Sequence, residues 1–362
     1  MSKIKRKSIY QQTRMQLGRW RRNWQAASLV TKGKQLAGAG NQPAALAVFR
    51  QAFDLNPSVP LAVYESLRES GASSPGYTQQ ADALLKSGRE AEANDQYRLA
   101  IATSGTYRET QDLDKLLQQV VGDNLVVITQ LAINYFSMFE IWYRYFRKCG
   151  GTNLLVVALD PVVYRKLREM DVPVYLLPVF NFQAGIRDIL WYETVRFRQR
   201  LIDMGVDYLH SDIDAFWLEN PLGKVRTLKA DIVASIGYGT PQYVVDDWGF
   251  VMCLGFYMMR SNAHTRKLYP SYIKYTRTCG HDQNGLNTLL WEQGTSWRPA
   301  PEGMLEGRCE RLGLSLVVVP DQMISRQESA YVGEIKPLVV HPLLEGKSMV
   351  SKMEQLKKAG IS

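Results

Sequence analysis

Residues 208–221 read YLHSDIDAFWLENP, and the fold prediction starts from this stretch. Residues 206–209 are typical of a short buried strand, and the chain turns polar directly after it. Asp212 and Asp214 stand two residues apart, so extended backbone would point both carboxylates to one face. Two carboxylates at the carboxyl end of a strand in an α/β sheet indicate a site for a hard cation, Mn²⁺ or Mg²⁺.

A D-x-D pair is a weak signal by itself, and the chain has a second one at Asp112-Leu113-Asp114. That copy lies in the charged stretch 111–120, which is typical of a solvated helix face and has no strand before it. The copy at 212–214 precedes the aromatic-rich run AFWL at 215–218. A simple turn remains the alternative for it, because aspartate is favoured in turns by its side-chain hydrogen bonds.

The surroundings of this motif resemble the D-x-D segment of nucleotide-diphospho-sugar transferases, in particular the family of plant rhamnogalacturonan xylosyltransferases and extensin arabinosyltransferases. The matching stretches are LIDMGVD at 201–207, SDID at 211–214 and WLENP at 217–221. The resemblance extends from about Asn124 to the C-terminus, where expected strands alternate with expected helices. It implies an α/β catalytic domain of GT-A fold, with a Rossmann-like, mostly parallel mixed sheet, a sugar-nucleotide donor and a divalent metal.

The resemblance also assigns residues to donor binding. Thr129 follows the first expected strand, at the edge where a nucleotide would lie. Asp160 ends the run ALD, which closes the nucleotide pocket in the family. Gly255 would let the backbone lie close to the donor sugar. Cys253 stands where the family has an asparagine that supports this sugar, so the sugar stays open.

Two basic residues are candidates for contacting the donor phosphates. Arg196 lies one turn from Arg200 on the helix expected over 185–204 and could reach them; an exposed basic helix face is the alternative. The run HPLLEGK at 341–347 partly matches glycogenin-like transferases. It would supply His341 as a third metal ligand and Lys347 as a phosphate ligand, although a histidine at a strand end is often structural.

The run HDQNGLN at 281–287 opens an expected helix. The resemblance makes Asp282 and Gln283 catalytic residues near the sugar and the acceptor, whereas a helix cap is the simpler role for Asp282. The implied function is metal-dependent transfer of a sugar from a nucleotide-diphosphate sugar, expected to be a UDP-sugar, to an unknown protein or glycan acceptor with retention. The alternative is a catalytically inactive GT-A-like binding protein.

Residues 26–118 are predicted to form an all-α, tetratricopeptide-like region before the catalytic domain at 119–362. A leucine, small residues and an aromatic residue recur in the same order at 36, 40, 45, 49 and 52 and again at 84, 88, 93, 97 and 100. Two repeats are too few to bury their faces alone, so we expect them to lean on the catalytic domain. They are a candidate surface for a protein partner.

The net charge of +9 is concentrated at the N-terminus, because the first acidic residue is Asp54. The basic segment 1–25 could touch an anionic membrane surface, while nucleic acid is an unlikely partner because no recognised binding motif accompanies it. No apolar run reaches the roughly 20 residues of a membrane helix. Plant relatives have such an anchor, so we expect this chain in a bacterial cytoplasm.

Overall fold

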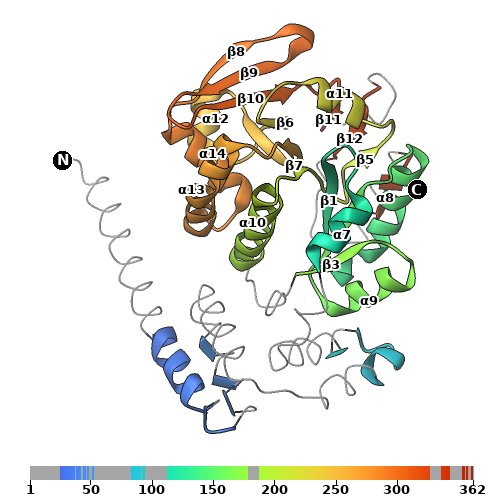
Figure 1. The fold of residues 1–362 in the computed structure, drawn as a ribbon, viewed down its shortest axis with the longest axis vertical. Helices are drawn as coiled ribbons and strands as arrows, with labels where there is room; N and C mark the ends of the chain where they lie inside the picture. The colour runs from blue at the N-terminus through green and yellow to red at the C-terminus, as the bar shows by residue number, and fades with distance from the viewer. Residues whose placement is uncertain are drawn as a thin grey trace, which may run out of the picture. The chain divides into compact units, whose positions relative to one another are not determined.

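The computed structural model describes residues 112–177, 187–326 and 336–342, together with short stretches between 25 and 93 and between 353 and 361. The chain divides into two compact units (Figure 1). The first comprises Met1–Thr110 with Val179–Ile189, and the second comprises Gln111–Pro178 with Leu190–Ser362. The second unit contains every predicted site residue.

The described part of the first unit is helical and places small residues inside. Ala45, Ala52 and Ala93 are fully buried, at positions where the repeat pattern requires small side chains. The aromatic positions of that pattern, Phe49 and Tyr97, and the basic segment up to residue 24 lie outside the described residues. The tetratricopeptide-like arrangement therefore stays a prediction.

The helix α7 (Leu113–Val120) carries the second D-x-D pair. Asp112 caps this helix by accepting a hydrogen bond from the backbone N–H of Lys115, and Asp114 lies in the first turn. Both aspartates are exposed, which confirms the predicted solvated helix face, and the structure adds that they lie at the start of the helix. α7 packs against strands β2 (Leu154–Ala158) and β3 (Val174–Leu176), so the domain boundary expected at residue 118 falls inside a helix of the second unit.

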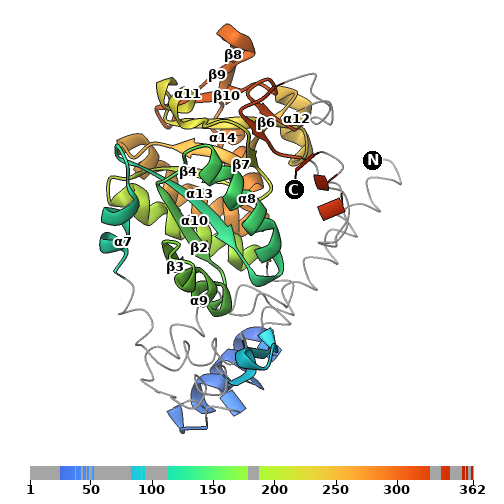
Figure 2. The same ribbon diagram turned by 90° about the vertical axis from the view of Figure 1, so that its right-hand side faces the viewer.

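A nine-stranded mixed sheet forms the centre of the second unit (Figures 1 and 2). Its order is β3-β2-β1-β4-β7-β6-β10-β9-β8. The strands not yet given are β1 (Leu125–Leu131), β4 (Asp207–Ser211), β6 (Ile232–Gly237), β7 (Val251–Met259), β8 (Ser296–Pro299), β9 (Leu305–Cys309) and β10 (Leu314–Val319). Parallel pairing joins β3, β2, β1 and β4, and also β6 with β10. The expected α/β class is confirmed.

Strand β7 runs antiparallel between β4 and β6 and is buried along its whole length. Burial on both faces explains its unbroken apolar sequence, VMCLGFYMM, which does not alternate. The last residue of β4, Ser211, pairs with Phe256. Residues 251–255 of β7 therefore continue beyond the end of β4, and the D-x-D segment leaves β4 directly beside Gly255.

A second, three-stranded sheet joins the motif to the C-terminal part of the unit. Its order is β11 (Ile324–Ser325), β12 (Val339–Val340) and β5 (Phe216–Trp217). β5 begins two residues after Asp214 and pairs antiparallel with β12. His341 follows β12 and donates its backbone N–H to the carbonyl of Ser325 at 2.8 Å. This small sheet therefore brings His341 next to the aspartates.

The helices pack on both sheets and deliver the remaining site residues. They are α8 (Phe136–Lys148), α9 (Pro161–Glu169), α10 (Arg187–Asp203), α11 (Leu222–Thr227), α12 (Gln242–Trp248), α13 (Ala263–Cys279) and α14 (Asp282–Glu292), with short 3₁₀ turns η1 (Ile133–Tyr135) and η2 (Pro301–Gly303). α13 ends at Gly280 in the left-handed conformation, so the chain enters α14 at once. α14 packs on β7 and α13. Within the described residues, no helix is long and apolar enough to cross a membrane.

Candidate metal and donor site

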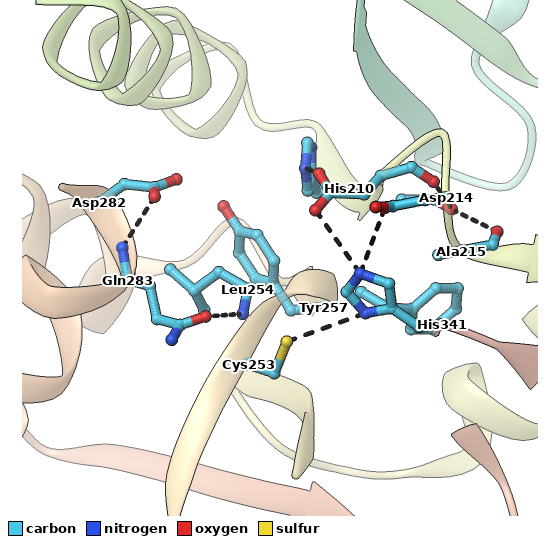
Figure 3. Close-up of polar contacts among 12 residues, drawn as sticks. His210, Asp214, Ala215, Cys253, Leu254, Tyr257, Asp282, Gln283 and His341 are labelled. Atoms are coloured by element: carbon cyan, nitrogen blue, oxygen red, sulfur yellow. Dashed lines mark hydrogen bonds and ion pairs between the residues drawn. The ribbon is translucent and has the colours of Figure 1, made fainter. Parts of the chain in front are cut away.

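A cavity of about 650 Å³ opens between the end of β4 and the start of α14. Six predicted site residues line it: Asp212, Asp214, Gly255, Asp282, Gln283 and His341. Several of them face one another in Figure 3. A larger cavity of about 830 Å³ lies against β8, β9 and β10, but none of the predicted residues lines it. The predicted site residues are therefore grouped in the smaller cavity.

Asp212, Asp214 and His341 offer one ligand atom each, and these atoms lie within 4.8 Å of one another. His341 Nε2 is 3.3 Å from Asp214 Oδ1 and 3.8 Å from Asp212 Oδ2. Two carboxylate oxygens and one imidazole nitrogen suit Mn²⁺ or Mg²⁺, with the other coordination positions left for substrate oxygens. The three predicted ligands are thus brought together, and they fit a divalent cation.

The local geometry that joins the two aspartates differs from the expected extended strand. β4 ends at Ser211, and the backbone N–H of Ala215 donates to the carbonyl of Asp212 at 3.0 Å, which closes a turn over residues 212–215. The expectation that strand alternation aims both carboxylates was therefore wrong. The alternative of a turn describes the backbone correctly, and the turn itself makes the carboxylates converge.

Gly255 supports this arrangement from β7. Its carbonyl accepts a hydrogen bond from the backbone N–H of Asp212 at 2.7 Å. A Cβ at this position would overlap the ring of His341 and lie 2.7 Å from Asp212 Oδ2. Glycine is thus needed here because the side chains of Asp212 and His341 approach the backbone, a different reason from the predicted approach of the donor sugar.

The imidazole of His341 bridges the aspartates and Cys253. Its Nδ1 lies 3.9 Å from Cys253 Sγ, which also accepts a hydrogen bond from Nη1 of Arg326. Burial alone would lower the pKa of His341, but the hydrogen bonds with Asp214 and Cys253 outweigh it and raise the pKa to about 10. Burial alone would raise the pKa of Cys253, but His341 and Arg326 lower it to about 7. A cation that binds here displaces the proton of His341.

His210 is a buried residue of the site that the sequence analysis missed. Its Nε2 lies 2.8 Å from Asp212 Oδ1. Burial and, next, the charge of Arg198 lower the pKa of His210, so we assign a neutral ring whose Nε2–H donates to Asp212. Such a contact fixes the orientation of a metal ligand. The available signal was its position two residues before Asp212, on the same face of the strand.

Asp282 forms the opposite wall of the cavity. It is the first residue of α14, and the cap is its neighbour His281, whose Nδ1 accepts from the backbone N–H of Gln283. Asp282 is 3% exposed, and its Oδ2 lies 2.7 Å from Nη1 of Arg198, which is fully buried. The side chain of Gln283 accepts from the backbone N–H of Leu254 at 3.2 Å, so it ties α14 to β7.

The structure does not bring Arg196 to the cavity. Its guanidinium lies 3.6 Å from Glu193 on the exposed side of α10. Each helical residue turns by about 100°, so Arg196 and Arg198 face nearly opposite directions. Arg198 is the arginine of α10 that turns inward to the site. The alternative of an exposed basic face for Arg196 is therefore correct.

Of the remaining predicted donor ligands, Thr129 and Asp160 do not line this cavity. Thr129 lies inside β1, which extends beyond the expected strand end, and its buried hydroxyl has no hydrogen-bond partner within the described ranges. Asp160 caps α9 through the N–H of Val163 and also accepts from the N–H of Ile133, at 2.9 and 2.8 Å. Lys347 lies outside the described residues. Their contacts with a nucleotide stay predictions.

Two plant proteins are similar to part of this chain. "Beta-arabinofuranosyltransferase RAY1" of Arabidopsis thaliana is 24% identical over 208 residues, which cover 54% of this chain and 38% of the relative. "Arabinosyltransferase XEG113" of the same plant is 26% identical over 202 residues, which cover 51% of this chain and 31% of the relative. The chain therefore spans about a third of the length of these two relatives.

Solved structures with a similar arrangement include two glycosyltransferases. The galactosyltransferase LgtC, in complex with donor and acceptor sugar analogues, matches with a TM-score of 0.37 and 10% identity, covering 65% of this chain and 95% of its own. The glycosyltransferase GlyE of Streptococcus pneumoniae TIGR4 matches with a TM-score of 0.37 and 13% identity, covering 66% and 61%.

The family model for nucleotide-diphospho-sugar transferases matches residues 149–356, more than half of the 362 residues. The matched range contains Asp212, Asp214, Asp282 and His341. The mixed sheet, with the D-x-D turn at the end of β4, is the GT-A arrangement that the resemblance implied. The chain belongs to the nucleotide-diphospho-sugar transferase family.

Proposed function

We propose that this chain is a metal-dependent glycosyltransferase that moves a sugar from a nucleotide-diphosphate sugar to a protein or glycan acceptor, with retention of the anomeric configuration. The observation that carries the proposal is the convergence of Asp212, Asp214 and His341 within 4.8 Å, in the cavity that Asp282 also lines. UDP-sugars are the first donors to test. Arabinose belongs among the sugars, because the names of both plant relatives contain it.

The side chains divide into two walls with different roles. Asp212, Asp214 and His341 hold Mn²⁺ or Mg²⁺, and His210 keeps Asp212 in position. The bound cation neutralises the negative charge that develops on the leaving diphosphate. On the other wall, Asp282 contacts the donor sugar or the acceptor, next to Gln283.

A thermal-shift panel of nucleotide sugars, each with and without Mn²⁺, is the first test, because a ligand that binds the folded state raises its stability. We expect donors to stabilise the protein only when the cation is present. Calorimetric titration of the best nucleoside diphosphate then compares wild type with Asp214→Asn. This variant loses a ligand charge but keeps nearly the same volume, so donor hydrolysis falls while the fold survives.

Equal nucleotide affinities with and without Mn²⁺, in both wild type and Asp214→Asn, would remove the metal from the proposal. A protein that hydrolyses and transfers no donor in the whole panel, yet is folded, would favour the alternative of an inactive binding protein. That alternative has less support, because all three metal ligands and Asp282 are retained in one cavity.

A further inference from the structure

Arg326 is a cationic residue that lines the same cavity and was not among the predicted site residues. Of the described residues that line the cavity, it is the only arginine or lysine. It directly follows β11, whose last residue, Ser325, accepts the backbone hydrogen bond of His341. The small sheet that positions His341 therefore also positions Arg326, and the two side chains enter the cavity from neighbouring strand ends.

The guanidinium of Arg326 has a contact that holds it but does not neutralise it as a carboxylate would. Its Nη1 donates to Cys253 Sγ, and no carboxylate of the described residues lies within ion-pair distance of it. The nearby Asp321 instead accepts from its backbone N–H at 3.4 Å. Arg326 is half-buried, so several of its five N–H donors remain available to a ligand.

The charges around the cavity show which kind of ligand this guanidinium fits. A divalent cation would offset Asp212 and Asp214, and Arg198 already offsets Asp282 from behind the wall. Once the cation is bound, Arg326 remains as a positive charge at the cavity wall, in contact with the sulfur of Cys253. A nucleotide diphosphate is negatively charged, and the charge of a cation that is already offset by Asp212 and Asp214 does not balance it fully. Arginine suits such a ligand because its planar guanidinium matches the geometry of phosphate and carboxylate oxygens.

The position of Arg326 separates it from the cation. Cys253 Sγ lies on the Nδ1 side of His341, whereas the aspartates lie on the Nε2 side. The guanidinium contacts this sulfur, which is the neighbour of Nδ1, whereas the carboxylates of Asp212 and Asp214 are the neighbours of Nε2. We therefore expect Arg326 and the cation to contact different oxygen atoms of the ligand.

We propose that Arg326 binds an anionic oxygen group of the sugar nucleotide beyond the reach of the metal, and that Cys253 holds the guanidinium in place for this contact. The inference rests on the proposed function and adds to it a residue that recognises the donor. Two parts of a donor carry this chemistry, namely the diphosphate, and a carboxylate on the sugar if the donor is a nucleotide uronic acid.

The test is calorimetric titration of full-length wild type, Arg326→Gln and Arg326→Lys in the presence of Mn²⁺. The ligands are UDP, UMP, a UDP-hexose and the matching UDP-hexuronic acid, with the same set on another base if UDP does not bind. Arg196→Gln is the matched control, because it removes the same charge from the exposed side of α10. Thermal unfolding of each variant confirms that it is folded.

If the contact is to the diphosphate, Arg326→Gln weakens UDP binding on the order of 10- to 100-fold, as expected for a charge-assisted contact, and weakens UMP binding much less. If it is to a sugar carboxylate, UDP affinity is unchanged and only the preference of wild type for the uronic acid over the hexose disappears. Arg326→Lys retains part of either effect, because it keeps the charge but loses the fork.

Affinities in Arg326→Gln that equal those of wild type and Arg196→Gln for every ligand overturn the inference and leave the proposed function intact. A wild type that binds no nucleotide of any base with Mn²⁺ overturns both. The two failures are therefore distinguishable in one set of titrations.

Discussion

Replacing Arg198 by methionine is expected to destabilise the second unit severely. The arginine is fully buried, and its Nη1 lies 2.7 Å from Oδ2 of Asp282, which is itself 4% exposed by side chain. Methionine fills much of the same volume but leaves a buried carboxylate without its cationic partner, while the backbone N–H of Gln283 still donates to Oδ1 of Asp282 at 2.8 Å. Breaking a buried pair in this way costs about 3–5 kcal/mol. That is about a fifth or more of the stability of a typical folded domain, and for a unit of this size it lowers Tm by about 6–20 °C.

The double variant Arg198→Met with Asp282→Asn removes both charges, so it distinguishes the interaction between the two residues from the interactions that each makes with its surroundings. Nε and Nη2 of Arg198 have no hydrogen-bond partner among the residues that the structure describes, so the pair is incompletely satisfied. A pair of this kind contributes little net stability when both partners are replaced. We therefore expect the double variant to recover most of the loss, so the losses of the two single variants are strongly non-additive in the double-mutant cycle.

Urea denaturation of wild type, both single variants and the double variant measures these four free energies. A single Arg198→Met variant within about 1 kcal/mol of wild type would refute the argument, because a buried carboxylate would then be tolerated alone. Additive losses in the double variant would refute the coupling. Asp282→Asn alone leaves a buried guanidinium without a carboxylate, so its activity must be measured where the variant is still folded.

Two further predictions concern the wall of the cavity formed by Asp212, Asp214 and His341, which we call the metal wall. Gly255→Ala introduces a Cβ that overlaps the ring of His341, so we expect a loss of about 1–3 kcal/mol in urea denaturation and a weaker affinity for Mn²⁺. The control is Gly223→Ala in α11, whose Cβ meets no atom within 4 Å; it should leave Mn²⁺ affinity unchanged and should not lower stability, because alanine is favoured over glycine in a helix. Because the pKa of metal-free His341 is raised to about 10, the proton is bound at neutral pH and must leave when a cation binds. The affinity for Mn²⁺ should therefore rise by up to about tenfold per pH unit between pH 7 and 9, and calorimetry in buffers of different ionisation enthalpy should detect the released proton. This dependence of Mn²⁺ affinity on pH should vanish in His341→Gln. The same raised pKa stabilises the metal-free protein fully below about pH 6.5, and this contribution is lost as the pH rises toward 10.

The sequence predicted which side chains converge at the cavity better than it predicted the backbone that presents them. Asp212 and Asp214 converge, but through a turn after β4, because the strand ends at Ser211. Periodicity could not show this, since a turn and an extended end place two alternate aspartates in similar directions. His341 lies far from the aspartates in sequence, and only its family position suggested it; its placement depends on the pairing of β12 with β5, which two-residue strands do not reveal in advance.

The error at Arg196 has a different physical origin. Both Arg196 and Arg198 belong to α10, and a charged residue is expected on the solvent side of a helix. A fully buried arginine is rare, and it is tolerated here because Asp282, far along the chain, lies opposite it. Sequence periodicity treats each charge as exposed, so it cannot identify the one that is buried by a distant partner.

The two walls of the cavity share one buried layer, and this makes their chemistry interdependent. The ring of Tyr257 lies 5.7 Å from the ring of His210 and 5.6 Å from Cζ of Arg198. His210 orients Asp212 on the metal wall, whereas Arg198 pairs with Asp282 on the other. The charge of Arg198 also helps to lower the pKa of His210, after burial, and so favours the neutral ring that donates to Asp212. Changing Arg198 therefore disturbs Asp282 directly, and it disturbs Asp212 indirectly through the protonation state of His210. A weaker affinity for Mn²⁺ in an Arg198 variant is consequently expected although Arg198 itself pairs with Asp282 on the opposite wall.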